Sequence, residues 1–139
     1  MKRLLFILPL CLLIALTGCT SRPESTAQDA SWLTDAKPIY VSEWPDNAFT
    51  AALPRPKSGE IDYIYDFSDA GRYGIWYKDI TIEQGKAYLQ ALKDNGWTSV
   101  AAEDGGVSVG TLFQKGDMSL SVALSEGVLG LLITQNAAQ

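Results

Sequence analysis

The sequence contains no histidine and only two cysteines among its 139 residues. The lack of histidine excludes catalytic triads and metal sites that use imidazole. Cys11 and Cys19 both lie near the N-terminus, so the rest of the chain has no thiol for a disulfide, a nucleophile or a metal ligand. The chain is 47% hydrophobic and 19% charged, which excludes disorder throughout and fits one globular domain.

The N-terminal segment has the layout of a secretory signal. Lys2 and Arg3 precede an apolar run at 4–16, which is shorter than the roughly 20 residues that a membrane span needs. The sequence Leu-Thr-Gly-Cys at 16–19 resembles the lipobox of bacterial lipoproteins, in which the cysteine receives lipid and becomes the first mature residue. We therefore expect a signal peptide at 1–18 and lipidation of Cys19. The alternative is an ordinary signal peptide with Cys19 merely near the cleavage site.

These features predict a location and a class of partner. Loss of the signal peptide leaves nine basic and sixteen acidic residues, a net charge of −7. Such a domain is a poor ligand for nucleic acid or anionic lipid. We expect a protein anchored by N-terminal lipid on the extracytoplasmic side of a bacterial membrane, in the cell envelope. Its expected ligand is an envelope protein or a glycan, with no cofactor and no nucleic acid.

The expected mature chain has three parts. Residues 19–42 comprise the lipidated cysteine and a flexible tether rich in Ser, Thr, Ala and Pro, 43–135 form a single α+β domain, and 136–139 are a tail. Trp32 and the apolar residues at 39–41 interrupt the tether's composition. We therefore expect the distal end of the tether to dock on the domain.

The first part of the domain predicts a short helical segment and a hairpin. The helical segment follows Trp44, with Asp46 or Asn47 as its cap, and ends at Pro54. Alternation of side chains predicts strands at 61–67 and 73–80, joined by a loop at 68–72. The expected register gives the pairs Tyr63–Tyr77, Ile64–Trp76 and Asp62–Lys78.

An amphipathic helix follows the hairpin. Thr81 and Gln84 form a capping box, and Gly96 in a left-handed conformation, followed by Trp97, ends the helix. Glycine inside a helix costs about 1 kcal/mol relative to alanine, so Gly85 indicates a close approach to the sheet.

The last part predicts a meander that follows a short strand at 97–101. Strand 107–114 turns at a two-residue loop, 115–116, which pairs Phe113 with Met118. A second turn at 125–128 pairs Leu124 with Leu129. The expected fold is α+β, with the order ββαβββ, an antiparallel sheet and one amphipathic helix packed on one face.

Several short motifs carry a resemblance over residues 43–134. They are Trp44-Pro45, Leu53-Pro54, Gly59 before the first strand, and Gly96-Trp97 after the helix that contains Tyr88. With the closing hairpins, they make the chain similar to a family of small bacterial lipoproteins known only as a domain of unknown function. The resemblance implies the α+β fold and supplies no catalytic residues.

Three patterns in the sequence bear on a catalytic or metal site. Asp62 and Asp66 share a strand face, but about 13 Å of extended strand separates them, and glycosidase carboxylates stand about 5–9.5 Å apart. The loop from Asp66 to Gly71 has two carboxylates that suit calcium, although a turn requires the same residue types. No Gly-x-Ser-x-Gly nucleophile motif occurs. We expect neither a catalytic nor a metal site.

Aromatic residues crowd the first hairpin. Flat rings with a polar edge suit sugars or peptide partners, although core packing under the helix uses the same residues. The predicted binding surface consists of Trp76, Ile64, Tyr73 and Tyr77. Trp76 is its expected anchor, unless Trp32 or Tyr40 of the docked tether covers it.

The sequence thus predicts a non-catalytic binding or interaction module. The alternative is a structural accessory subunit of an envelope assembly, and a cell-wall or polymer hydrolase comes third. An exposed aromatic patch would favour the first, an aliphatic patch or a bare sheet edge the second, and converging carboxylates the third.

Overall fold

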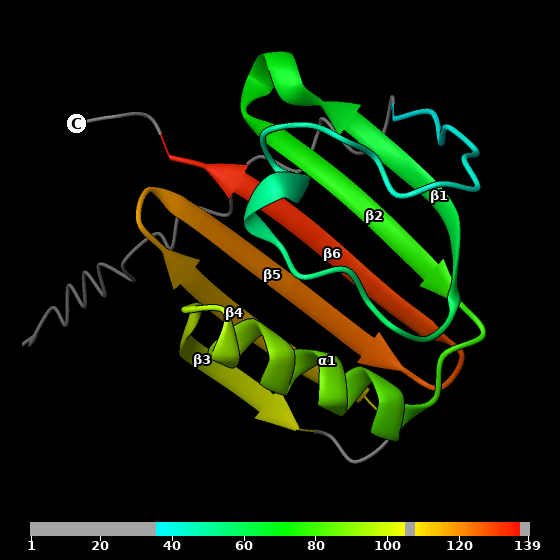
Figure 1. Ribbon diagram of the computed structural model, residues 1–139, viewed down its shortest axis with the longest axis vertical. Helices are drawn as coiled ribbons and strands as arrows, with labels where there is room; N and C mark the ends of the chain where they lie inside the picture. Colours follow the sequence, from blue (N-terminus) through cyan, green and yellow to red (C-terminus); the bar gives the residue numbers. More distant parts are fainter. Residues whose placement is uncertain (1–35, 105–107, 137–139) are drawn as a thin grey trace, which may run out of the picture. The chain divides into compact units, whose positions relative to one another are not determined.

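The computed structural model describes residues 36–104 and 108–136, which form one six-stranded antiparallel sheet and one α-helix (Figure 1). The strands are arranged as β1-β2-β6-β5-β4-β3. The elements are β1 Glu60–Phe67, β2 Arg72–Lys78, α1 Ile82–Asp94, β3 Thr98–Asp104, β4 Ser108–Lys115, β5 Met118–Ser125 and β6 Val128–Gln135, with short 3-10 helices η2 Thr50–Ala52 and η3 Ser68–Ala70.

The antiparallel α+β architecture is confirmed, whereas the predicted order ββαβββ is wrong. The chain order is ββαββββ, because each of the four segments after α1 becomes a strand. The segment expected as a short strand at 97–101 extends as β3 along six paired positions of β4 and forms one edge of the sheet.

One face of the sheet, here called the inner face, is covered twice. In Figure 1, α1 lies across the β3–β5 half, and the coil that contains η2 crosses in front of β2 and β6. Trp97, which follows α1, donates a hydrogen bond from Nε1 to the carbonyl oxygen of Ala52 in η2, at 3.1 Å. Phe49 stacks on Tyr73 of β2 with ring centroids 5.8 Å apart. The core therefore lies between the inner face and these two covers, and the opposite, outer face has neither.

Helix α1 begins and ends where the sequence predicts. The Thr81 hydroxyl accepts from the backbone N–H of Gln84, and the Gln84 side chain accepts from the N–H of Thr81. Gly96 is left-handed with φ 86°, and Trp97 donates its backbone N–H to Leu92. Gly85 is buried against Leu124 of β5, which confirms the predicted close approach.

The meander places the predicted residues in the core with one change of register. Leu124 faces Leu129 as predicted. Phe113 faces Leu120 and not Met118, because the two-residue turn lies at 116–117, one residue later than predicted, which moves each cross-strand partner by two residues. A shift of two residues preserves the side-chain faces, so the alternating apolar residues of β4 and β5 are still buried.

The first hairpin differs from the prediction by one residue. Its loop has four residues, formed by η3 and Gly71 with φ 69°, where five were expected. The observed pairs are Tyr63–Trp76, Ile64–Ile75, Tyr65–Gly74 and Glu60–Lys78, with Asp62 in a bulge. The predicted pairs Ile64–Trp76, Tyr63–Tyr77 and Asp62–Lys78 therefore do not form. A one-residue shift exchanges the faces, so Trp76 lies beside Tyr63 on the outer face.

The segment before the domain docks on the edge of β1. Ile39 and Ile64 exchange two backbone hydrogen bonds, each 2.9 Å long. The Tyr40 and Tyr63 rings meet edge to face at 6.3 Å. These contacts agree with the expected docking of residues 39–41, whereas Trp32, Cys19 and the expected signal peptide lie outside the described residues. Within the described ranges, no helix is long and apolar enough to span a membrane.

Candidate functional site

The outer face carries a cluster of four aromatic side chains from β1 and β2, here called the aromatic cluster: Tyr63, Tyr65, Phe67 and Trp76. Tyr63 stacks on Trp76 with ring centroids 5.5 Å apart and an angle of 14° between the ring planes. Tyr65 meets Trp76 edge to face at 5.2 Å. Each of the four side chains is partly exposed. The cluster is thus an ordered group of rings that solvent can still reach.

Two glycines create the space that the Trp76 indole occupies. A Cβ atom on Gly74, two residues earlier in β2, would overlap the six-membered ring of the indole. A Cβ on Gly130, the cross-strand partner of Trp76 in β6, would stand 3.1 Å from the indole nitrogen. Both glycines are buried. The indole therefore lies down over the backbone of two strands, and any side chain at these positions would displace it.

The tyrosines give the cluster a polar margin. Burial among the rings raises the pKa of the Tyr63 hydroxyl, with smaller contributions from Tyr65, Asp62 and Tyr40. Tyr63 is therefore neutral at physiological pH and can donate a hydrogen bond as well as accept one. The rings thus offer an apolar contact area, and the hydroxyl offers a directional hydrogen bond.

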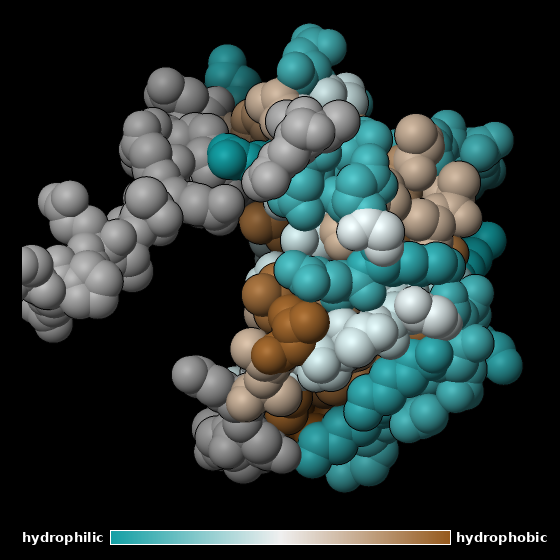
Figure 2. All heavy atoms as spheres, turned by 90° about the vertical axis from the view of Figure 1, so that its left-hand side faces the viewer, coloured by the Kyte–Doolittle hydropathy of each residue, from teal (hydrophilic) through white to brown (hydrophobic). Residues whose placement is uncertain are grey.

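Small side chains continue the outer face beyond the cluster. The row that contains Trp76 runs through Gly130, Ala123 and Gly110 of the three following strands. The neighbouring rows contain serine and threonine from β5 and β6, namely Ser119, Ser121, Ser125 and Thr134. Figure 2, seen from the side where β6 ends, shows hydrophobic side chains at mid-height, with polar side chains above and below them. The same rows also contain the aliphatic residues Leu112, Leu132 and Val128, of which Leu112 and Val128 are exposed. The outer face thus combines raised rings with a lower surface on which hydroxyl groups alternate with aliphatic side chains.

The structure separates the four residues predicted as a binding surface. Trp76 lies on the outer face, whereas Ile64, Tyr73 and Tyr77 are buried on the inner face, with at most 6% of each exposed. The predicted surface therefore does not form as one patch. Tyr73 and Tyr77 alternate with Trp76 along β2 and face the other side in any register. The one-residue shift of the β1–β2 register places Ile64 opposite Ile75 on the inner face.

Sequence reasoning missed Tyr63 and Tyr65 as neighbours of Trp76. One signal could have located them: Gly74 stands two residues before Trp76 in a strand pattern, and glycine inside a strand indicates close approach of another group. Residues two apart on a strand face the same side of the sheet, so Gly74 indicates that the Trp76 indole lies over it.

The acidic residues that could have formed a catalytic or metal site support the fold instead. Asp62 is the bulged residue of β1. The Asp66 carboxylate accepts a hydrogen bond from the backbone N–H of Ser68, at 3.0 Å, and so supports the turn. Within residues 36–104 and 108–136, no group of three or more acidic side chains converges in a way that could hold a metal ion.

No known protein family, curated protein or solved structure matches this chain significantly. A function must therefore be inferred from the residues and their geometry.

Proposed function

We propose that this chain is a non-catalytic binding module, anchored by lipid on the extracytoplasmic side of a bacterial membrane, and that the outer face of its sheet binds glycan. The signal-like residues 1–18 and the lipobox-like sequence that ends at Cys19 support the anchor. The aromatic cluster on the outer face, which neither α1 nor the coil with η2 covers, is the observation that supports binding.

A glycan fits this face better than an apolar partner does. Sugars present apolar C–H faces that pack on rings and hydroxyl groups that need hydrogen-bond partners. Trp76 provides the ring, the Tyr63 hydroxyl provides a donor and acceptor beside it, and the adjacent rows provide serine and threonine hydroxyls. An extended glycan could thus contact the cluster and the serine and threonine hydroxyls of the adjacent rows together.

A structural accessory subunit is the second candidate. The outer edge of β3 has no strand partner among residues 36–104 and 108–136, and Val100 on it is 48% exposed. A bare edge can pair with a strand of another protein. However, Val100 is the extra residue of a bulge, which interrupts such pairing, so glycan binding remains the first proposal.

The binding proposal is tested by titrating the soluble chain from Thr20 onward with N-acetylglucosamine and glucose hexasaccharides. Truncation of a central aromatic anchor weakens binding by about tenfold or more, so we expect this loss for Trp76→Ala. Val100→Ser removes an exposed apolar side chain away from the cluster and should bind as the wild type does. Equal binding by wild type and Trp76→Ala, or binding of neither sugar, would contradict the proposal.

The anchor is tested by Cys19→Ala in the full chain. Stable attachment requires more than one acyl chain, and the cysteine is the acceptor in the proposed processing. We expect unprocessed precursor to accumulate and lipid labelling to disappear. Normal processing with retention at the membrane would show that another feature attaches the protein.

A further inference from the structure

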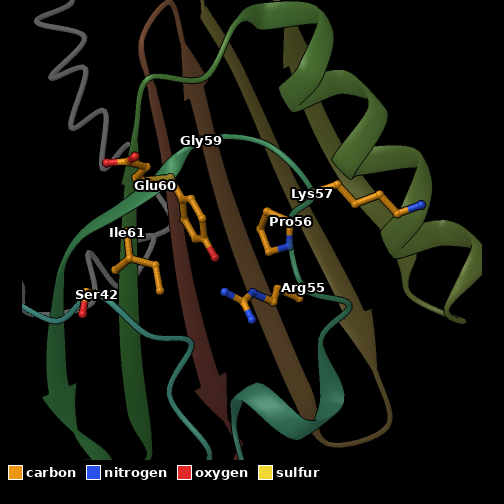
Figure 3. A pocket seen from close by; sticks show the side chains of 8 residues that line it. Ser42, Arg55, Pro56, Lys57, Gly59, Glu60 and Ile61 are labelled. Carbon is orange, nitrogen blue, oxygen red and sulfur yellow. The ribbon is translucent and has the colours of Figure 1, made fainter.

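A cavity of about 550 Å³ opens on the inner side of the sheet (Figure 3). Its lining residue Tyr77 is next to Trp76 in β2 and faces the opposite side of the sheet from the aromatic cluster. It lies between the start of β1 and the connection that precedes this strand. Its volume falls within the range of small-molecule sites, about 300–1,000 Å³. The cavity is thus large enough for a compact organic ligand.

Two hydrogen-bond donors line this cavity without an acceptor from the described part of the chain. Arg55 is exposed to solvent and Tyr77 is buried, and neither donor has an acceptor among residues 36–104 and 108–136. Burial raises the pKa of Tyr77 to about 12, although the nearby Arg55 lowers it, so the hydroxyl carries its proton at neutral pH. Arginine presents a planar set of donors that matches a carboxylate. The pair therefore suits an anion.

The other charged groups at the cavity do not compete for this anion. Figure 3 shows Arg55 reaching toward Ile61 and Ser42, whereas Lys57 and Glu60 extend away from it. Glu60 lies opposite Lys78 in the register of β1 and β2. The polar centre of the cavity is thus formed by Arg55, Tyr77 and the Ser42 hydroxyl.

Apolar side chains complete the lining. Pro56 is buried and Ile61 is partly buried, and both line the cavity. The Tyr88 hydroxyl is buried with no hydrogen-bond partner in the described part of the chain, and it lies close enough to Tyr77 for the two to interact electrostatically. A ligand with one anionic end and a small apolar body matches this combination.

We propose that this cavity binds a small organic carboxylate, whose oxygens accept hydrogen bonds from the Arg55 guanidinium and the Tyr77 hydroxyl and whose apolar part rests on Pro56 and Ile61. This site lies on the opposite side of the sheet from the aromatic cluster and does not depend on glycan binding. It gives the module a second ligand of different chemistry.

The test is an NMR titration of the soluble chain from Thr20 onward with three probes: propionate, its neutral isostere propionamide, and inorganic phosphate. Because propionate is small, we expect the cavity to bind it with a Kd of about 1 mM. We expect propionamide to bind at least about tenfold more weakly, because it lacks the charge that arginine recognises. The perturbed signals should come from residues 55–61 and 77.

Three variants locate the site. Arg55→Gln should weaken propionate binding by about tenfold and Tyr77→Phe by about threefold, since each removes one donor. Lys57→Gln removes an equal charge from the rim and should change the Kd by less than about twofold, because this side chain points away. The spectrum of each free variant shows whether it is folded.

Four results would overturn the proposal. Propionate could fail to bind the wild type, or propionamide could bind equally well. Lys57→Gln could weaken binding as much as Arg55→Gln does, which would indicate attraction by net charge alone. Phosphate could bind about tenfold more tightly than propionate, which would assign the cavity to phosphate-type anions.

Discussion

At the scale of single residues, glycines determine how closely elements approach one another. Replacing a solvent-facing helix glycine with alanine normally stabilises a protein by about 1 kcal/mol. At Gly85 the new Cβ would overlap Leu124, which is only 1% exposed and has no space to move into. We therefore expect Gly85→Ala to lower the free energy of unfolding by about 1–3 kcal/mol.

Urea denaturation measures this effect. The double variant Gly85→Ala, Leu124→Ala is the control, because the overlap then disappears and the two losses should not add. An increase in the stability of Gly85→Ala alone would show that α1 does not pack this closely on β5.

Two buried tyrosines make stability depend on alkaline pH. Burial raises the pKa of Tyr77 to about 12 and also raises that of Tyr88 above 10. Above pH 10 the unfolded chain loses these protons while the folded chain keeps them, so folding becomes less favourable as the pH rises. The free energy of unfolding keeps its full value below pH 10. As the pH rises from 10 toward 12, it falls by about 1.4 kcal/mol per pH unit for each tyrosine. Urea midpoints between pH 9 and 11.5 should fall accordingly, and Tyr77→Phe should reduce the slope.

The Tyr88 hydroxyl destabilises the folded state, and its removal should make the protein more stable. It is buried with no hydrogen-bond partner among residues 36–104 and 108–136, and such a group costs about 1–3 kcal/mol. We expect Tyr88→Phe to raise the free energy of unfolding at pH 7 by up to about 1 kcal/mol. A loss of stability on this substitution would show that the hydroxyl has a partner in solution.

At the scale of elements, both edge strands of the sheet carry a bulge. Asp62 interrupts β1 and Val100 interrupts β3. Bulges twist an edge and hinder pairing with another chain. Deletion of Val100 would make β3 continuous, so we expect the chain to self-associate at concentrations where the wild type is monomeric. Sedimentation velocity measures this, with Val100→Ser as the bulge-retaining control; a deletion variant that stays monomeric and folded would contradict the role of the bulge.

The hairpins show which parts of the fold follow from the sequence. Capping residues and alternation are local signals, and they predict α1 and the buried faces of β4 to β6 correctly. Register depends on the length of each turn. In the β1–β2 hairpin, η3 and Gly71 close the loop one residue sooner than expected, which moves Trp76 to the side of Tyr63.

The candidate sites were accessible to sequence reasoning to different degrees. Trp76 could be singled out because it stands in an aromatic hairpin, but its neighbours depend on that register. The cavity at Arg55 could not be predicted, because its lining combines Ser42, a connection at 55–59 and Tyr77, which only the tertiary fold brings together. No local pattern links segments that are this far apart in the chain.

At the scale of the whole molecule, the two faces of one sheet have separate roles. The inner face is covered by α1 and by the coil with η2, and it holds the core and the Arg55 cavity. The outer face has no such cover and presents the aromatic cluster. With an acidic sequence and a proposed lipid anchor, this arrangement suits a module that is held at a membrane and presents its outer face to envelope glycan.

The most direct test of this account follows the indole N–H signal of Trp76 in the NMR spectrum while the soluble chain from Thr20 onward is titrated with N-acetylglucosamine hexasaccharide. Binding on the outer face should shift this signal together with the backbone signals of Tyr63 and Tyr65, and leave those of Tyr73 and Tyr77 in place. Shifts confined to the inner face, or saturable binding with no change at Trp76, would contradict the assignment of the outer face as the binding surface.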